Sequence, residues 1–302
     1  MLVWGGQGIL AVIVVVFLGR TLTAHWGELT NLEVAVAPRP GPILLSALVV
    51  LLTYALLVEA WRRVLAGWGG HIGWVAAAGV WTVSNLGRYI PGKIWTVAGL
   101  AVLAKRAGAD GWAATASAAT MQVLSLGTGI AVVLAIVPAT AGVPVGGAAV
   151  VALAALVVIV IALISPAVVR VLDRLVPRLS LRPLPVGAVV AGVLATTAAW
   201  VTYGVAFWLL AAGLFSDPDL SVSRAVGTFT AGYIVGFLAL FAPGGAGVRE
   251  AAFIGLLAPT MGLPQAFALS VFSRVLLTIT ELVAALLGML TRRSRGDVND
   301  RS

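Results

Sequence analysis

The sequence predicts an all-α polytopic membrane protein with about six full spans and two Pro/Gly-broken re-entrant hairpins, arranged as an inverted repeat. Of its 302 residues, 61% are apolar and only 10% are charged. Apolar runs long enough to cross a hydrocarbon core of about 30 Å recur along the chain. Two apolar stretches are broken by Pro-Gly, and the breaks at Pro91 and Pro243 lie 152 positions apart, half the chain. Corresponding breaks in two halves are typical of repeat-built membrane proteins with a binding site at the midplane.

Six stretches are long and apolar enough to be full spans. The first, at 2–19, has no basic segment before it and no clear cleavage site after it, so we expect a retained helix rather than a signal peptide. The others are expected at 41–60, 112–137, 147–165, 187–214 and 266–290. Together they form one transmembrane domain over residues 1–290, with repeat 1 at about 1–140 and repeat 2 at about 141–290. Residues 291–302 are expected to be a disordered, basic cytoplasmic tail.

The two remaining apolar stretches, Gly73 to Ala104 and Ala225 to Ala258, are each cut by Pro-Gly into arms of about 18 and 13 residues. Arms this short are marginal as full spans, which favours re-entrant hairpins. The alternative is four ordinary short spans, giving ten crossings. Proline is tolerated in the first turn of a helix, so Pro91 and Pro243 are expected to open the second arm of each hairpin.

The basic residues fall mainly on one side of this arrangement. With both termini in the cytoplasm, the outer loops hold three Lys or Arg residues, Arg20, Arg39 and Arg224, and the inner loops hold twelve. This positive-inside bias predicts a protein of the cytoplasmic membrane in which the two hairpins enter from opposite faces. The inner residues are Arg62, Arg63, Lys105, Arg106, Arg170, Arg174, Arg178, Arg182, Arg292, Arg293, Arg295 and Arg301.

A small set of charged residues remains at membrane depth. Insertion scales put the cost of such a charge at about 2.5 kcal/mol or more, so these groups usually face a bundle interior, a partner or a water-filled cavity. Four are positive and two are negative, which predicts an anionic ligand. They are Arg88, Lys93, Arg249, Glu250, Arg274 and Glu281.

The start of each second arm is a candidate phosphate site. Backbone N–H groups there are free, the helix dipole favours negative charge, and the run Gly244-Gly245-Ala246-Gly247 lets an anion approach closely. Lys93 and Arg249 place cations beside a positive helix end, which is unfavourable unless an anion binds. The predicted headgroup and phosphate site comprises Asn85, Arg88, Pro91, Gly92, Lys93, Pro243, Gly244, Gly245, Gly247 and Arg249.

Polar residues of the final span are spaced to share one helical face: Ser270, Arg274, Thr278 and Glu281. We expect Arg274 to reach Glu250, and Glu281 to reach Arg249 or Lys93. Arg249 and Glu250 are adjacent, and adjacent helical side chains point about 100° apart, so these two are expected not to pair. The alternative is that such pairs only lock helix to helix.

Several other functions are excluded. The chain has no cysteine, and His25 and His71 stand alone, so no metal site is expected. Gly87 to Lys93 matches a P-loop pattern, but Ile94 replaces the Ser or Thr that would hold magnesium. The net charge of +8 lies in loops, so nucleic acid is not an expected partner. No catalytic set or nucleotide fingerprint is present, which predicts transport or binding without a cofactor rather than enzymatic activity.

Two segments carry a family resemblance, SNLGRYIPGK at 84–93 and APGGAGVREA at 242–251. The chain resembles, over nearly its whole length, the flippase-like integral membrane proteins related to the N-terminal transmembrane domain of lysylphosphatidylglycerol synthases. Relatives often carry Glu-Arg in the span after the first hairpin, where this chain has Met121-Gln122. Gln122 lies 152 residues before Arg274, so both halves place polar groups at equivalent positions, and Gln122 joins the predicted charge network.

The resemblance implies a membrane domain that binds or moves a lipid with a polar headgroup. In the synthases this domain precedes a soluble domain that transfers lysine from charged tRNA to phosphatidylglycerol. Here the chain ends about a dozen residues after the last span, so we expect synthase activity to need a separate polypeptide. The expected ligands are an anionic or aminoacylated phospholipid or a polyprenyl-phosphate-linked lipid. The alternatives are a secondary transporter of a small polar solute, a scaffold for a lipid-modifying enzyme, and a membrane transferase with Glu250 as its base; a homodimer is left open.

Overall fold

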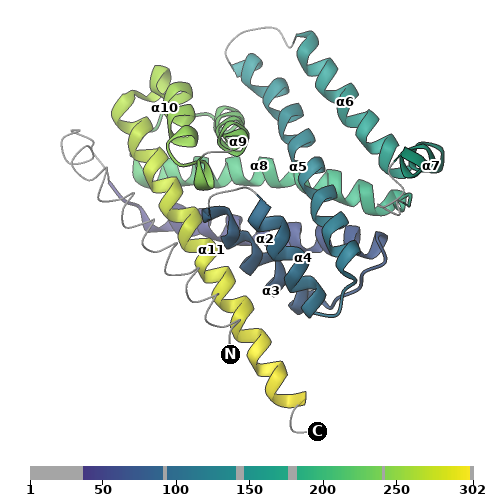
Figure 1. The fold of residues 1–302 in the computed structure, drawn as a ribbon. Coiled ribbons are helices and arrows are strands. Elements are labelled where there is room, and N and C mark those ends of the chain that lie inside the picture. The colour runs from purple at the N-terminus through teal and green to yellow at the C-terminus, as the bar shows by residue number, and fades with distance from the viewer. Residues whose placement is uncertain (1–36, 91–93, 141–145, 176–181, 240–241, 300–302) are drawn as a thin grey trace.

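The computed structural model describes residues 37–90, 94–140, 146–175, 182–239 and 242–299, and these residues form helices joined by turns, with no strand among them (Figure 1). The predicted all-α class is therefore confirmed. The elements are α2 (Pro40–Gly67), α3 (Trp74–Asn85), η1 (Leu86–Tyr89), α4 (Ile94–Arg106), α5 (Gly111–Thr140), α6 (Gly147–Ile164), α7 (Pro166–Leu175), α8 (Val186–Leu214), α9 (Val222–Leu238), η3 (Pro243–Gly245), α10 (Val248–Met261) and α11 (Leu263–Asn299).

Five helices in this part of the chain are long and apolar enough to cross a membrane. They cover Pro40–Gly67, Gly111–Pro138, Gly147–Ile164, Val186–Leu214 and Leu263–Leu290. These match five of the six predicted spans, and the sixth, at 2–19, lies outside the described residues. In α6, Leu156 is the one buried side chain, as expected for a helix that exposes apolar residues to lipid. The chain is thus a multi-pass membrane protein.

Each predicted broken stretch contains two α-helices with a short 3-10 turn between them. The first is α3, η1 and α4, and the second is α9, η3 and α10. The prediction that Pro243 opens the second arm is wrong. Pro243 begins the short 3-10 turn η3, and α10 begins at Val248. Gly244, Gly245 and Gly247 all have positive φ, at 56°, 69° and 79°, so the backbone does not enter the helix until the last of them has been passed. Pro91 lies outside the described residues.

Two segments that the sequence predicted as loop or tail are helical. The loop after the fourth predicted span contains α7, whose valines lie on one face and whose Arg170, Asp173 and Arg174 lie on the other. The helix α11 continues to Asn299. Residues 291–299, predicted as part of a disordered tail, are therefore helical. Residues 291–299 contain no proline, and arginine is a good helix former, which allows the helix to continue beyond the last apolar residue.

The helices of the two halves pack reciprocally. The first arm of each broken stretch packs on the last long helix of the other half, α3 on α11 and α9 on α5. The breaks η1 and η3 also contact each other, as the sequence predicted for two breaks that meet. In Figure 1 the green α9 and α10 lie above α8, and the blue α3 and α4 lie below it. An inverted repeat predicts this exchange of partners.

The long helices α2 and α8 form the most extensive pair, and the same kind of arginine-to-carbonyl contact joins them at both ends. An Arg-Pro-x-Pro segment lies at the start of each helix: Arg39 is the N-cap of α2 and is followed by Pro-Gly-Pro in its first turn, and Arg182-Pro-Leu-Pro directly precedes α8. Arg39 donates to the carbonyls of Ala212 and, at 2.8 Å, of Phe215, where α8 ends. Arg182 donates to the carbonyl of Trp68, where α2 ends. Each arginine thus satisfies carbonyls that a helix C-terminus leaves unpaired and places a cation at the negative end of the dipole.

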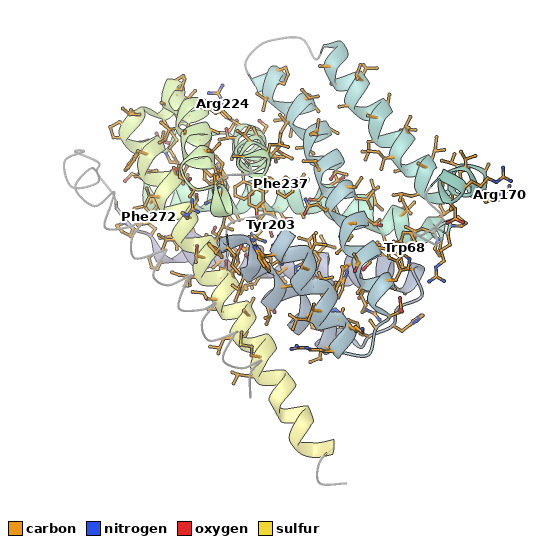
Figure 2. The ribbon with its side chains drawn as sticks, viewed as in Figure 1. Trp68, Arg170, Tyr203, Arg224, Phe237 and Phe272 are labelled. Atoms are coloured by element: carbon orange, nitrogen blue, oxygen red, sulfur yellow. The ribbon has the colours of Figure 1, made fainter. Side chains whose placement is uncertain are left out.

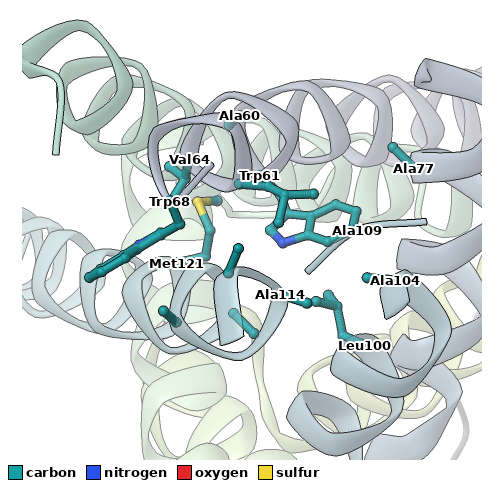
Figure 3. Packing of buried hydrophobic residues seen from close by; sticks show 14 of the residues in the cluster. Ala60, Trp61, Val64, Trp68, Ala77, Leu100, Ala104, Ala109, Ala114 and Met121 are labelled. Atoms are coloured by element: carbon teal, nitrogen blue, oxygen red, sulfur yellow. The ribbon is translucent and has the colours of Figure 1, made fainter. Parts of the chain in front are cut away.

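Two hydrophobic clusters hold the helices in place. The first is centred on the fully buried Trp61 of α2, which lies among Leu100 and Ala104 of α4 and Ala114 of α5 (Figure 3). Its indole N–H donates to the Ser117 hydroxyl at 3.0 Å, so the ring is buried without leaving a polar atom unpaired. The second cluster joins α2 and α8 to α9, α10 and α11. Both clusters contribute residues to the walls of one cavity.

Candidate functional site

A cavity of about 200 Å³ lies where the two breaks meet. All described helices except α6 and α7 contribute lining residues. Tyr203 and Phe237, which line it, are near the middle of the molecule in Figure 2, whereas Arg170 and Arg224 lie at its periphery. Eight of the predicted site and network residues line the cavity: Asn85, Arg88, Gln122, Gly244, Gly245, Arg249, Arg274 and Glu281.

The remaining predicted residues are placed differently. Glu250 does not line the cavity but contacts Arg249 and Arg274, which do. Gly247 contacts Glu250 in turn. Pro243 begins η3, immediately before the lining residues Gly244 and Gly245. Pro91, Gly92 and Lys93 lie outside the described residues, so the structure leaves their predicted roles as predictions.

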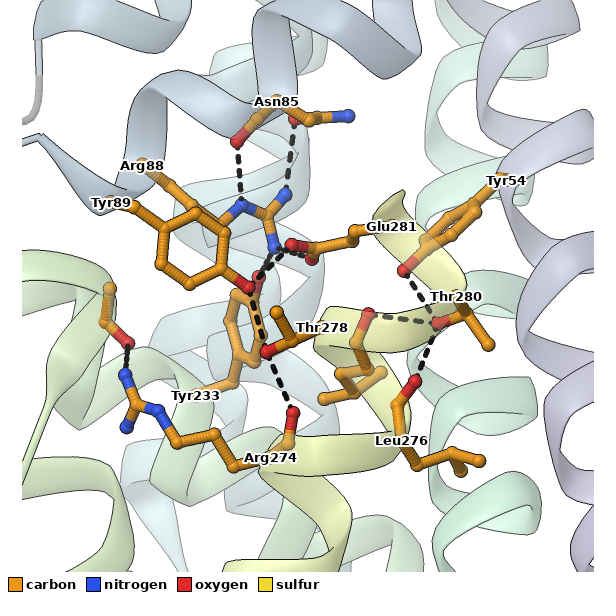
Figure 4. Close-up of polar contacts among 12 residues, drawn as sticks. Tyr54, Asn85, Arg88, Tyr89, Tyr233, Arg274, Leu276, Thr278, Thr280 and Glu281 are labelled. Atoms are coloured by element: carbon orange, nitrogen blue, oxygen red, sulfur yellow. Dashed lines mark hydrogen bonds and ion pairs between the residues drawn. The ribbon is translucent and has the colours of Figure 1, made fainter. Parts of the chain in front are cut away.

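The first break carries a neutral ion pair. Arg88 Nη1 lies 2.6 Å from Glu281 Oε1, and the Glu281 side chain is only 5% exposed (Figure 4). Arg88 also donates to Tyr233 Oη at 2.5 Å and to Asn85 Oδ1 and O at 3.1 Å. The prediction that Glu281 reaches Arg249 or Lys93 is wrong for Arg249. Because η1 packs on α11, it is Arg88 of η1 that lies beside the Glu281 carboxylate.

A chain of hydroxyl groups connects this pair to the preceding turns of α11, towards Arg274. Tyr89 donates to Glu281 Oε2 at 2.7 Å and lies 3.0 Å from Thr278 Oγ1. Thr278 in turn donates to the carbonyl of Arg274 at 2.8 Å. Arg274, Thr278 and Glu281 all line the cavity, as their spacing predicted, whereas Ser270 is buried elsewhere. The polar face of α11 therefore links the two breaks directly.

The second break carries two arginines and one carboxylate. Glu250 Oε1 lies 2.5 Å from Arg274 Nη1 and 3.2 Å from Arg249 Nη2. The prediction that Arg249 and Glu250 do not pair is wrong. Glu250 turns back to accept the Gly247 N–H at 2.7 Å, which caps α10, and this brings the carboxylate within reach of the long Arg249 side chain.

Among the described residues of this second cluster, positive charge is in excess. The side chains of Arg249, Arg274 and Glu250 are 8%, 5% and 14% exposed, so two buried guanidinium groups share one carboxylate. Arg249 Nε is buried and has no hydrogen-bond partner among the described atoms. The guanidinium lies 6.0 Å from the ring centroid of Tyr233 and 5.7 Å from that of Phe253. A buried cation with an unused donor favours an anion beside it.

The glycine amides are partly engaged by the protein itself. Gly245 N–H donates to the Ala242 carbonyl at 3.0 Å, and Gly247 N–H donates to Glu250. Gly245 is also a point of close approach, since an added Cβ would lie 3.0 Å from the Cα of Gly236 on α9. The phosphate predicted at residues 244–247 would thus compete with protein acceptors at two of the amides.

Aromatic residues form a part of the site that the sequence analysis missed. Trp81, Trp200, Tyr203 and Tyr233 line the cavity, and Trp200 meets Tyr233 edge-on at 5.7 Å between ring centroids. The chain has only four tyrosines, all inside apolar stretches rather than at span ends where tyrosine usually gathers. That placement was a signal for the cavity. Within the described part of the chain, no group of three or more His, Cys, Asp or Glu residues is arranged to hold a metal ion.

The chain matches a protein-family model over the whole site. A family model described as "Lysylphosphatidylglycerol synthase TM region" matches residues 5–285. The match includes both breaks and every described residue that lines the cavity. No curated protein matches the chain.

Proposed function

The chain belongs to the lysylphosphatidylglycerol synthase TM region family, and from this premise we propose that it binds and translocates a lipid with a phosphate-bearing polar headgroup. The ligand would be an anionic or aminoacylated phospholipid or a polyprenyl-phosphate-linked lipid. The protein would act in the cell membrane with both termini in the cytoplasm. It would be a transporter or binding protein rather than an enzyme.

One observation carries the proposal, namely the excess of buried positive charge beside the cavity. Arg249 and Arg274 both line it, and among the described residues both pair with the same carboxylate, Glu250. Guanidinium groups bind phosphate with pairs of parallel hydrogen bonds, which makes phosphate a better fit than a lone halide or a neutral polar group. A phosphate oxygen beside Arg249 Nε would supply the acceptor that this buried donor lacks.

The size of the cavity supports a headgroup rather than a whole lipid. Its volume of about 200 Å³ is below the range of roughly 300–1,000 Å³ usual for drug-sized ligands. The acyl chains would then stay in the bilayer while the headgroup enters. Aromatic walls such as Trp200 and Tyr233 suit the glycerol and ester part of the headgroup because they offer apolar area, while their own polar atoms are bonded to Ser125 and Arg88.

The reciprocal packing of the two halves supports movement of the bound headgroup. In alternating access, one repeat rocks against the other around a fixed site between them. Here the site lies at η1 and η3, which belong to different halves and contact each other. Rocking at this contact would expose the cavity to one side of the membrane and then to the other.

The test is mass spectrometry of the lipids that the purified protein retains, compared with the host membrane. The variants are Arg249→Gln and, as a matched control, Arg170→Gln, which alters an exposed arginine on α7 far from the cavity. We expect the wild type and Arg170→Gln to enrich one phosphate-bearing lipid, and Arg249→Gln to lose that enrichment. Retention of bulk lipid alone, unchanged by Arg249→Gln, would contradict the proposal and favour a solute transporter or a scaffold.

A further inference from the structure

We propose that Glu250 is an internal competitor for the ligand's phosphate: its carboxylate holds the two arginines while the site is empty and must release at least one of them when an anion binds. This inference rests on the proposed function and deepens it. It proposes that the Glu250 carboxylate sets the affinity for the ligand and promotes its release.

The contacts of Glu250 are those that a phosphate group would make. Its two oxygens accept from Arg274 Nη1 at 2.5 Å, from Arg249 Nη2 at 3.2 Å and from the Gly247 N–H at 2.7 Å. Two guanidinium groups and an amide at a helix N-terminus form a typical protein site for phosphate. The 14-residue helix α10 therefore begins with an anion of its own already in place.

The arginines are shared between the carboxylate and the cavity. Arg249 and Arg274 line the cavity, whereas Glu250 does not. Each arginine therefore contacts Glu250 through one terminal nitrogen and also borders the cavity. An incoming anion would bind these terminal nitrogens only when Glu250 releases them, whereas Arg249 Nε has no partner among the described atoms and needs no such release.

Competition of this kind suits a protein that must release its ligand. If Arg249 and Arg274 lost this carboxylate, two buried guanidinium groups would each lose a charged partner, which is unfavourable. Glu250 stabilises the empty state. A ligand must therefore use part of its binding free energy to displace the carboxylate, and its observed affinity is lower. When the carboxylate returns to the arginines, the bound phosphate loses the same donors and departs.

The substitution Glu250→Gln removes the charge and preserves the local structure. Glutamine serves as well as glutamate in a capping box, so its amide oxygen can still accept the Gly247 N–H. Its NH₂ group then faces the arginines and cannot bind them. Glu250→Asp is the second variant, since its shorter side chain keeps the charge but reaches the two guanidinium groups less well.

The chain offers a matched control in Glu59 on α2. Its carboxylate is also shared by two arginines, Arg62 at 2.9 Å and Arg63 at 2.8 Å. None of these three residues lines the cavity. Glu59→Gln therefore makes the same change in net charge and breaks the same kind of contact at a place where no ligand is expected.

The experiment measures equilibrium binding to the purified full chain in detergent. The probes are dihexanoyl phosphatidylglycerol, free glycerol phosphate and, as an uncharged reference, dihexanoylglycerol. We expect Glu250→Gln to bind the phosphate-bearing probe about tenfold more tightly and to release it more slowly, because one competing charge-assisted contact is removed. Glu250→Asp should bind it with intermediate affinity, and Glu59→Gln should match the wild type.

The possible outcomes separate this inference from the proposed function. Unchanged or weaker binding by Glu250→Gln, while Arg249→Gln abolishes it, would overturn the competition and leave the phosphate site standing. No preference of the wild type or of Glu250→Gln for a phosphate-bearing probe over dihexanoylglycerol would overturn both. Tighter binding by Glu250→Gln supports the competition with either probe; wild-type binding of the lipid alone identifies a headgroup site, and binding of glycerol phosphate just as well identifies a solute site.

Discussion

The two breaks occupy equivalent positions in the two halves but carry different electrostatics. At the first, one arginine meets one carboxylate, Arg88 with Glu281, and Tyr89, Tyr233 and Asn85 satisfy the remaining groups. At the second, two arginines share Glu250, and a buried Arg249 donor has no partner among the described atoms. Among the described residues, the first break therefore carries balanced charge and the second carries one more positive than negative charge. Substitutions at each break test this difference.

Glu281→Gln is expected to have the largest effect on stability. It leaves the Arg88 guanidinium without its carboxylate, which should lower the free energy of unfolding by about 3 kcal/mol. Thermal unfolding in detergent measures this loss. The double variant Arg88→Gln, Glu281→Gln should be more stable than Glu281→Gln alone, because no uncompensated charge remains. If the single variant unfolded like the wild type, the first break would not be the complete pair described above.

Gly245→Ala tests the close packing of the second break. The residue has φ of 69°, and an added Cβ would lie 3.0 Å from backbone atoms of Gly236. Strain and overpacking together should cost about 1–3 kcal/mol, again read from thermal unfolding. The control is Gly255→Ala in α10, where an added Cβ meets no atom within 4 Å and should be neutral or stabilising. Equal behaviour of the two variants would contradict the tight contact between α9 and η3.

The arginines that begin the two Arg-Pro-x-Pro segments should be equivalent. Arg39→Gln and Arg182→Gln each remove a cation from the carbonyl end of a helix, with an expected cost of about 0.5–1 kcal/mol. Both are measured by thermal unfolding, with Arg170→Gln as the exposed reference. Similar losses would show that the two ends of the α2–α8 pair contribute equally to stability. A large difference would mean that one end of the α2–α8 pair dominates.

Arg249→Gln should change stability least of the four. Removing it leaves Arg274 and Glu250 as a neutral pair, so we expect a change within about 1 kcal/mol, part of it from the lost contacts with Tyr233 and Phe253. Thermal unfolding of this variant beside Glu281→Gln compares the two breaks directly. A loss as large as that of Glu281→Gln would show that Arg249 holds the fold rather than a ligand.

The sequence was sufficient to predict five of the six expected spans and the contact between the two breaks. Apolar length and the paired Pro-Gly motifs predicted five helices that the structure contains and the contact between η1 and η3. These features depend on period and composition alone. The spacings of four and three residues along α11 placed Arg274, Thr278 and Glu281 on one face, and all three line the cavity. Ser270, predicted on the same face, does not line it.

The partners of each charge could not be predicted in this way. Whether Glu281 meets Arg88 or Arg249 depends on how η1 turns and packs on α11, which residue spacing does not determine. The pairing of Arg249 with Glu250 depends on the capping of α10, where the helix rule for adjacent side chains does not hold. The tyrosines were missed because one residue in an apolar run does not reveal which side of the helix faces a cavity.

The arginine at the start of α2 bonds the end of α8, and the arginine before α8 bonds the end of α2, which has a consequence for how the protein is made. The carbonyl of Trp68 receives its donor from Arg182, 114 residues later in the chain, and that of Ala212 receives its donor from Arg39, 173 residues earlier. At a synthesis rate of about 5–20 residues per second, the end of α2 waits roughly 6–23 s for its cap. During that interval the first half is incompletely bonded. Each half completes the other, so maturation in the membrane is a joint event and follows translation of the second half.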